Sequence, residues 1–189
     1  MKKIKEHNFV FKSGNITIRT IKNSDLEFYK KWYKEWHILQ EAVNRISNDE
    51  IERMIYLDSK ISYIFIIEIE GNNCGELSVT KDTSVIVKNN EYIKPFYNFW
   101  MNIYNDISDT EIETVLGNFI VSLKTSKLKI NTLFTMIYTD DEKKYENNYL
   151  NCNFKEIRRE NYKTKMEKFF SKKGIENPYY KSKILMRKI

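Results

Sequence analysis

Hydrophobic and polar positions change their period several times along this chain, and each change marks a predicted element. Residues 16–21 alternate and are rich in β-branched side chains, which predicts a strand. A capping cluster at 23–25 follows, and the apolar positions after it recur at helical spacing to about Trp36. Residues 47–49 cap a second helix. The apolar positions predicted for these helices are Leu26, Tyr29, Trp32 and Tyr33 in the first and Ile51, Met54, Ile55 and Leu57 in the second.

The middle of the chain has the pattern of consecutive antiparallel strands. Residues 63–69 predict an apolar strand, and the sequence Glu-Gly-Asn-Asn at 70–73 predicts a turn. Residues 74–80 return as the partner strand. The polar segment 82–90 is typical of a hairpin or a loop, and 92–104 predict a long aromatic strand.

The next part of the chain predicts a helix, a strand and a shorter helix. The first helix begins at Asp109, and the strand covers 130–138. The second helix is capped at 140–141 and ends near Leu150. The long helix places apolar residues at helical spacing, namely Ile112, Val115, Leu116, Phe119, Ile120 and Leu123.

Two further strands, at 154–165 and 183–189, complete the predicted elements. The basic segment 166–182 between them predicts a loop or a short helix inserted before the last strand, because it contains Gly174 and Pro178. The resulting order, β-α-α-β-β-β-α-β-α-β-β, predicts one α/β domain of the α+β type over residues 1–189. We expect a single mixed, mostly antiparallel sheet of six to seven strands with helices on both faces.

Composition narrows the class of protein. The chain has 189 residues, of which 41% are hydrophobic, so it is long enough for one domain with a full core. No apolar run approaches the roughly 20 residues of a membrane span. Cys74 and Cys152 are the only cysteines, and they lack the spacing of a metal site. We therefore expect a cytoplasmic protein with reduced thiols, no metal and no membrane partner.

The net charge of +6 is concentrated near the end of the chain. Residues 163–189 contain nine Lys or Arg and two Glu. Lysine outnumbers arginine 26 to 6, and a nucleic-acid binder usually has a basic face with arginine contacts. The composition therefore argues against a nucleic-acid partner, and binding of nucleic acid or an acidic partner by the terminal segment stays open as a third hypothesis.

The order of elements and several local sequences resemble the GNAT superfamily of acyl-CoA N-acyltransferases over residues 15–189. The opening ITIRTIKNSDLEFYKKW is similar to the family's first strand, polar cap and first helix. The segment IIEIEGNNCGELSV resembles its second and third strands, with Gly71 at the turn and Gly75 after it. The resemblance implies transfer of an acetyl group from acetyl-CoA to a primary amine of a small molecule or a protein N-terminus, by a monomer or a homodimer.

A second part of the resemblance lies in YENNYLNCNFKEIRR. The family's short fourth helix closes with a tyrosine, three residues and Gly-Phe, and Tyr149 and Phe154 stand at the aromatic positions. Asn153 replaces the glycine and tolerates a left-handed backbone. The resemblance implies that Tyr149 protonates the leaving thiolate of CoA. The alternative is a tyrosine that packs the helix on the sheet.

The turn predicted to bind the pyrophosphate of CoA departs from the family pattern. The family has Gln/Arg-x-x-Gly-x-Gly/Ala there, whereas residues 104–109 read YNDISD, without glycine or arginine. The carboxylates of Asp106 and Asp109 favour a helix start but repel a pyrophosphate. We expect binding through backbone N–H groups, with a dissociation constant above ~100 μM. The residues assigned to CoA are Asn102, Ile103, Tyr104, Asn105, Asp106, Ile107, Ser108, Asp109, Lys143 and Lys144.

The acceptor side is harder to assign from the sequence. Trp36 and Glu76 are the candidates for contacting the acceptor, and the alternatives are a core tryptophan and a solvated residue on a strand face. An amine must lose a proton before it attacks, and the candidate acceptors of that proton are placed by position only: Glu76, Glu91, Asn98 and Asn102. A catalytically degenerate GNAT-fold module with a binding or regulatory role remains the alternative to an enzyme.

Overall fold

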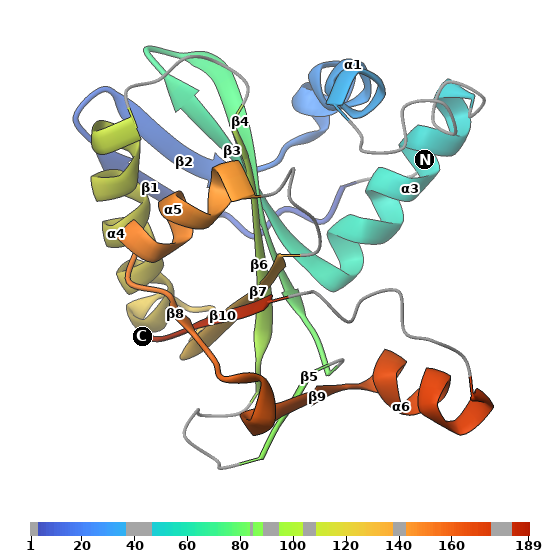
Figure 1. Cartoon of the computed structure of the whole chain (residues 1–189). Helices are drawn as coiled ribbons and strands as arrows, with labels where there is room; N and C mark the ends of the chain where they lie inside the picture. Colours follow the sequence, from blue (N-terminus) through green and yellow to red (C-terminus); the bar gives the residue numbers. More distant parts are fainter. Residues whose placement is uncertain are drawn as a thin grey trace. The chain divides into compact units, whose positions relative to one another are not determined.

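The computed structural model describes residues 4–36, 47–83, 85–88, 95–103, 109–137, 143–174 and 183–189. The chain forms two compact units (Figure 1). Unit 1 comprises residues 1–79 and 101–105, and unit 2 comprises residues 80–100 and 106–189. Both units combine strands with helices, and most of the strand pairs are antiparallel, which confirms the predicted α+β class.

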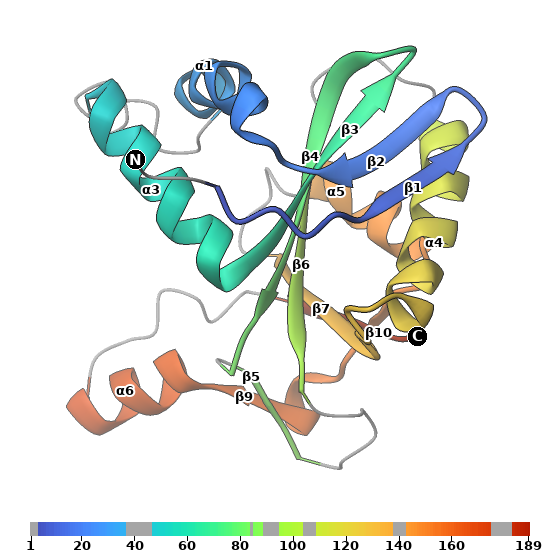
Figure 2. The ribbon, with the colours of Figure 1, turned by 180° about the vertical axis from the view of Figure 1, so that it is seen from behind.

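Unit 1 is built on antiparallel strands. Its hydrogen-bonded order is β1-β2-β3-β4, followed by the end of β6. Strand β2 pairs with β3 in the register Ile18 to Ile67, and Figure 2 shows β1 and β2 in blue beside β3. A left-handed pair, Glu70 and Gly71, closes the hairpin from β3 to β4, as predicted. The bounds are β1 Val10–Ser13, β2 Ile16–Thr20, β3 Ser62–Ile69 and β4 Asn72–Lys81.

Two helices pack on the strands of unit 1, namely α1 (Leu26–Trp36) and α3 (Asn48–Ile61). Helix α3 begins with the predicted cap, because Ser47 and Glu50 exchange hydrogen bonds in a capping box. Leu57 is 50% exposed, so its predicted place in the core is wrong. It belongs to the outward face of α3, whose inward positions are taken by its neighbours in the turn. The core of this unit includes Ile21, Tyr29, Ile51, Ile55, Tyr56, Ile64 and Ile66.

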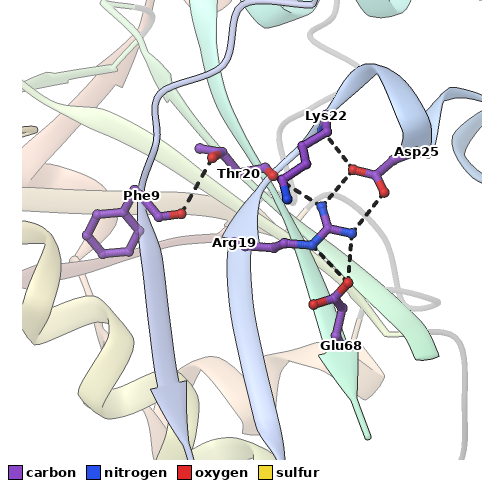
Figure 3. Close-up of polar contacts among 6 residues, drawn as sticks. All are labelled: Phe9, Arg19, Thr20, Lys22, Asp25 and Glu68. Carbon is purple, nitrogen blue, oxygen red and sulfur yellow. Dashed lines mark hydrogen bonds and ion pairs between the residues drawn. The ribbon is translucent and has the colours of Figure 1, made fainter. Parts of the chain in front are cut away.

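A partly buried ion-pair network connects β2 with the start of α1 (Figure 3). The Arg19 guanidinium donates to both oxygens of Asp25 at 2.7 and 2.8 Å, and its Nε donates to Glu68 Oε1 at 2.8 Å. The Asp25 carboxylate also accepts from the backbone N–H of Lys22 at 2.7 Å. These carboxylates raise the pKa of Arg19 further above its ordinary value. The predicted capping cluster thus forms a short 3-10 turn, Asn23–Asp25. Arg19 connects this turn to Glu68 of β3 by charge-assisted hydrogen bonds.

Unit 2 contains a mixed set of strands in the order β6-β7-β10-β8, together with a separate pair, β5-β9. Strand β10 runs antiparallel to β7 along its full length, and β6 runs parallel to β7. Helix α4 begins at the predicted Asp109 and buries the predicted apolar face. The bounds are β5 Val85–Val87, β6 Tyr97–Ile103, α4 Asp109–Thr125, β7 Thr132–Ile137, α5 Lys143–Asn151, β8 Lys155–Glu156, β9 Tyr162–Thr164, α6 Lys165–Lys173 and β10 Lys183–Lys188.

The predicted strand at 154–165 is wrong in its middle. Strand β8 ends at Glu156, a 3-10 turn follows at Arg159–Asn161, and β9 pairs with β5. The run of charged residues from Arg158 to Glu160 is exposed, and a continuous strand would have turned alternate members inward. The predicted hairpin or loop at 82–90 therefore supplies β5. In the basic segment 166–182, the described part forms most of α6.

The number of strands also differs from the prediction. Among the described residues, the hydrogen-bonded strands β1-β2-β3-β4-β6-β7-β10-β8 form a sheet of eight strands, whereas six to seven were predicted. Strand β1 was not predicted. Its burial pattern alternates only between exposed and half-buried, because an edge strand has one neighbour and little core to cover. Its sequence therefore lacks a strong apolar signal.

Candidate active site

Strand β6 separates from its parallel neighbour β7 inside unit 2. The paired residues are Tyr97 with Leu133 and Asn98 with Phe134, and among the described residues the ladder continues no further. Strand β7 itself stays paired with β10 as far as Ile137. The divergence is therefore a departure of β6.

Two buried polar atoms lie at this divergence without a hydrogen-bond partner among the described residues. They are Oδ1 of Asn98, in the last ladder pair, and Oγ1 of Thr135, the next residue of β7. Each such atom costs about 1–3 kcal/mol of desolvation. A further unpartnered hydroxyl, that of Thr132, lies at the other end of β7. Unsatisfied groups at the end of an interrupted ladder are suited to hydrogen bonds with a ligand.

Tyr149 lies on α5 and is 2% exposed. Its ring makes edge-to-face contacts with Phe99, at 6.2 Å between centroids, and with Phe154, at 5.5 Å. Phe99 is the first residue of β6 beyond the ladder. Asn153 takes the left-handed conformation expected of it, with φ of 61°. This lets the backbone N–H of Phe154 donate to the carbonyl of Tyr149 at 3.0 Å. The helix end thus fixes the tyrosine beside the divergence.

The C-terminal end of α5 is anchored by two neighbouring elements. Arg187 of β10 donates from Nη1 to the carbonyl oxygen of Cys152 at 2.6 Å. A cation there complements the negative end of the helix dipole. Asn151 donates to Glu113 of α4 at 2.6 Å. These contacts hold the turn that carries Tyr149, and the sequence offered no signal for them because the partners are 35 and 38 residues away.

Cys152 lies next to this turn but has no reactive character. It is 2% exposed, and burial raises the pKa of its thiol to about 11. The thiolate is therefore scarce at neutral pH. Cys152 is therefore a buried cysteine without a role in the chemistry proposed below.

Glu76 is buried in unit 1, so the alternative of a solvated residue on a strand face is wrong. It is 5% exposed, and its Oε1 accepts a hydrogen bond from the hydroxyl of Tyr29 on α1 at 2.8 Å. The neighbouring Gly75 has no room for a side chain. A Cβ there would lie 2.7 Å from the carbonyl oxygen of Asn102 and 3.3 Å from Cα of Ile103. The sequence placed Tyr29 on an apolar face and gave no sign of its polar role.

The structure describes the other predicted site residues only in part. Asn102 and Ile103 end β6 and are half-buried. The backbone of Trp36 ends α1, that of Asp109 begins α4, and that of Lys143 begins α5. The side chains of these three residues and of Lys144 are not described. The remaining predicted residues lie outside the described ranges: Tyr104, Asn105, Asp106, Ile107, Ser108 and Glu91.

Comparison with known proteins identifies the fold. No protein-family model and no curated protein sequence matches the chain. Among solved structures, a chimaera of spermidine N-acetyltransferase SpeG from Vibrio cholerae and hSSAT has a TM-score of 0.63 at 19% identity. The match covers 93% of this chain and 96% of that one. The ribosomal alpha-N-protein acetyltransferase RimL, in complex with coenzyme A, has a TM-score of 0.62 at 11% identity, covering 96% and 98%.

A third structure is SpeG from Vibrio cholerae in complex with CoA and spermine. Its TM-score is 0.59 at 17% identity, and the match covers 93% of this chain and 96% of that one. Identities of this size carry the fold alone. The chain has the fold of the GNAT N-acetyltransferases, as its sequence predicted. Among the described residues, none of the helices has the length and apolar character needed to span a membrane.

Proposed function

We propose that this protein is an N-acetyltransferase that moves an acetyl group from acetyl-CoA to a primary amine of a small molecule or a protein N-terminus. The observation that carries the proposal is the end of the β6–β7 ladder after Asn98. Unpartnered buried oxygens of Asn98 and Thr135 border it. The ring of Tyr149 contacts Phe99 immediately beyond it. The likeness of the fold to SpeG in complex with CoA and spermine is consistent with this chemistry.

The proposed reaction is a direct attack in a ternary complex. The neutral amine nitrogen forms a bond to the thioester carbonyl carbon, and the bond from that carbon to sulfur breaks. Tyr149 donates its hydroxyl proton to the leaving thiolate and recovers a proton from solvent. The nitrogen loses its remaining extra proton, so one amide and one thiol are formed. The packing of Tyr149 between Phe99 and Phe154 would hold its hydroxyl in one orientation.

CoA would be held mainly by backbone groups. The segment Asn102 to Asp109 connects β6 to α4, and the N-terminus of α4 supplies a favourable dipole for the pyrophosphate. Lys143 and Lys144, at the start of α5, would meet the 3′-phosphate. The turn has no glycine and contains Asp106 and Asp109, so we expect binding to be weak. Trp36, at the end of α1, would line the acceptor side.

The test combines calorimetry with a turnover assay. The protein is titrated with acetyl-CoA, and thiol release is then followed across a panel of alkylamines and N-terminal peptides. We expect weak binding of acetyl-CoA and amine-dependent thiol release. Absence of both would contradict the proposal. Cys74 and Cys152 are buried free thiols, which is compatible with action in the cytoplasm. We propose separately that the protein acts as a monomer or a homodimer.

The glycine-free turn favours a second hypothesis from another class. In that hypothesis the fold has lost catalysis and serves as a binding or regulatory module. The measurement that distinguishes the two hypotheses is the turnover of acetyl-CoA, not the stability of the protein. CoA binding without thiol release for any amine in the panel would favour the module, whereas amine-dependent release favours the enzyme.

A further inference from the structure

A cavity lies in unit 2, beside the short strand β5 and the start of β6. Its volume is about 420 Å³, which falls within the range of small-molecule sites. The backbone N–H of Asp82 donates to the carbonyl oxygen of Phe96 at 3.2 Å, which joins the two ends of the segment that surrounds it. Most of the described lining is apolar, so the cavity is suited to an apolar group that leaves water. The described lining residues are Asp82, Thr83, Val85, Ile86, Pro95 and Phe96.

The cavity and the last ladder pair of β6 with β7 lie on the same face of β6. Phe96, which lines the cavity, packs in one apolar cluster with Phe134, the ladder partner of Asn98. Val87 and Tyr162, a register pair of β5 and β9, belong to the same cluster. Side chains two residues apart on a strand point to one face, and their Cα atoms are about 7 Å apart. The side chain of Asn98 is therefore next to that of Phe96.

The proposed general acid lies on the opposite face of β6. Phe99 follows Asn98, so its side chain points the other way, and there its ring contacts Tyr149. A thioester at the divergence of the strands would have Tyr149 on one side and the Asn98 amide on the other. The Oδ1 atom of Asn98 is buried without a hydrogen-bond partner among the described residues. An amide oxygen accepts hydrogen bonds, so this atom is suited to an N–H of the attacking amine.

We propose that the cavity binds the apolar body of the acceptor and that Asn98 Oδ1 accepts a hydrogen bond from its amine nitrogen. This inference rests on the proposed acetyltransferase function and names its substrate class. The acceptor is a primary amine with a single positive charge and an alkyl chain or an aromatic ring. A nitrogen at Asn98 and a body that passes Phe96 span about 7 Å, which is comparable to the length of a hexyl chain.

Charged groups at the border of the cavity disfavour a second positive charge on the acceptor. The Lys165 ammonium donates to the hydroxyl of Thr83 at 2.7 Å. Lys163 of β9 is exposed and stands opposite Ile86 in the β5–β9 ladder. Like charges repel, and an ammonium is costly to move from water into an apolar cavity. Asp82 is the acidic residue of the described lining, so the test includes an acceptor that carries a second ammonium.

Asn98 takes no proton in the proposed step. An amide oxygen is not a base at neutral pH, so it orients the neutral amine, and the extra proton of the nitrogen passes to solvent. The nitrogen forms a bond to the thioester carbonyl carbon while the bond from that carbon to sulfur breaks. One ammonium and one acetyl thioester give one amide, one thiol and one released proton.

The first part of the test compares three amines on the parent protein by steady-state kinetics with acetyl-CoA. The amines are ethylamine, hexylamine and 1,6-diaminohexane. Burial of each methylene gains about fourfold in affinity. The additional methylenes of hexylamine should therefore raise kcat/KM by up to about 10²-fold over ethylamine. The diamine should fall well below hexylamine, although the two have the same carbon chain.

The second part fills the cavity. Ile86 lines it and is half-buried, so Ile86→Trp should place an indole in the space proposed for the acceptor. It should lower kcat/KM for hexylamine by about tenfold or more and change the value for ethylamine little. Val121→Trp is the matched control, because Val121 lies on α4 and is 49% exposed. Both variants should bind acetyl-CoA as the parent does, which calorimetry measures.

The third part removes the amide oxygen. Asn98→Leu keeps the approximate shape of the side chain and should raise the KM for ethylamine and hexylamine alike by about two- to tenfold, the range of one hydrogen bond. The urea midpoint should not fall, because the oxygen has no partner to lose among the described residues. Thr132→Val is the matched control. Its buried hydroxyl is also unpartnered there but lies at the other end of β7, so neither KM should change.

Several results would overturn the inference. Equal kcat/KM for ethylamine and hexylamine would remove the cavity from the acceptor site, while the proposed acetyltransferase function stands. A preference for the diamine would assign the acceptor to the Asp82 carboxylate instead. A lower urea midpoint with unchanged KM in Asn98→Leu would make Asn98 structural. Acetyl-CoA binding without thiol release for any amine would contradict the proposed function and the inference together. If Ile86→Trp does not fold, the amine series on the parent decides the question.

Discussion

The polar groups around Arg19 in unit 1 have hydrogen-bond partners, whereas two buried polar atoms at the divergence of β6 from β7 in unit 2 have none among the described residues. Around Arg19, the guanidinium meets two carboxylates, and Asp25 also accepts from a backbone N–H. At the divergence, Asn98 and Thr135 each keep a buried oxygen without a partner among the described residues. Satisfied networks stabilise a fold, whereas unsatisfied atoms cost stability and are retained where a ligand uses them. The difference separates the scaffold from the candidate site.

Tyr149→Phe should have the largest effect, and it should act mainly on turnover. Loss of acid catalysis lowers turnover by about 10²- to 10⁴-fold. The ring contacts with Phe99 and Phe154 remain, so the cost in unfolding free energy stays at about 0.5–1.5 kcal/mol. The measurements are thiol release with a reactive amine and urea denaturation. Unchanged turnover would remove Tyr149 from the mechanism.

Asp25→Ala should have the opposite profile, with a large effect on stability. It leaves the Arg19 guanidinium with Glu68 and the carbonyl oxygen of Thr20 as partners, and the Arg19 side chain is 12% exposed. Breaking a fully buried pair from one side costs about 3–5 kcal/mol, and we expect a loss near the lower end because this network is partly buried. Chemical denaturation measures this loss. Activity per folded molecule should stay close to the parent's. Lys30→Ala breaks pairs with Glu27 and Glu52, whose side chains are 85% and 31% exposed, and it should cost less stability.

Thr135→Val should sharpen the comparison at a single atom. Removing a buried hydroxyl that has no partner should leave the unfolding free energy unchanged or raise it by about 1 kcal/mol. The same change should weaken acetyl-CoA binding, because the hydroxyl is proposed to face the ligand. Thr132→Val is the matched control, since its hydroxyl is also unpartnered but lies at the other end of β7. Equal CoA affinities for the two variants would contradict the assignment.

Asp106→Gly should tighten CoA binding by a modest amount. Removing one carboxylate near the N-terminus of α4 relieves repulsion of about 0.3–1 kcal/mol, which is about two- to fivefold in dissociation constant. Calorimetry with CoA at low ionic strength measures the change. Low-micromolar binding by the parent would refute the argument from the chemistry of the turn.

His7 is a buried polar group of unit 1 that lacks a hydrogen-bond partner at Nε2 among the described residues. We expect it to give the stability of the protein a small dependence on pH. Its Nε2 is buried without a partner among the described residues, and burial lowers the pKa of the imidazole below its usual value. As the pH falls, His7 therefore takes up a proton in the unfolded chain at a higher pH than in the folded protein. Its contribution to the unfolding free energy is fully present above about pH 6.5 and is lost as the pH falls through the folded pKa. Urea midpoints at pH 5 and pH 7.5 should show a smaller difference for His7→Gln than for the parent.

Parts of the candidate site were predictable because they depend on local backbone requirements. Asn153 was expected in a left-handed conformation from its place after Tyr149, and it has one. The turn at 70–73 and the start of α4 at Asp109 also follow from short-range signals. The pairing of Tyr29 with Glu76 was not predictable, since each position looked typical of its own element. Only the packing of α1 on the strands brings them to 2.8 Å.

The sequence by itself determined most of the helices and strands, because capping residues and apolar periodicity act over a few neighbours. Its resemblance to the GNAT family predicted the fold and the place of Tyr149 near the end of α5. The tertiary structure decided where the β6–β7 ladder ends, how 154–165 divides between β8 and β9, and which polar atoms are left unpaired. Those outcomes depend on contacts between residues far apart in the chain. Burial and hydrogen bonding at such contacts outweigh local preference, because each can exceed the fractions of a kcal/mol that propensity contributes.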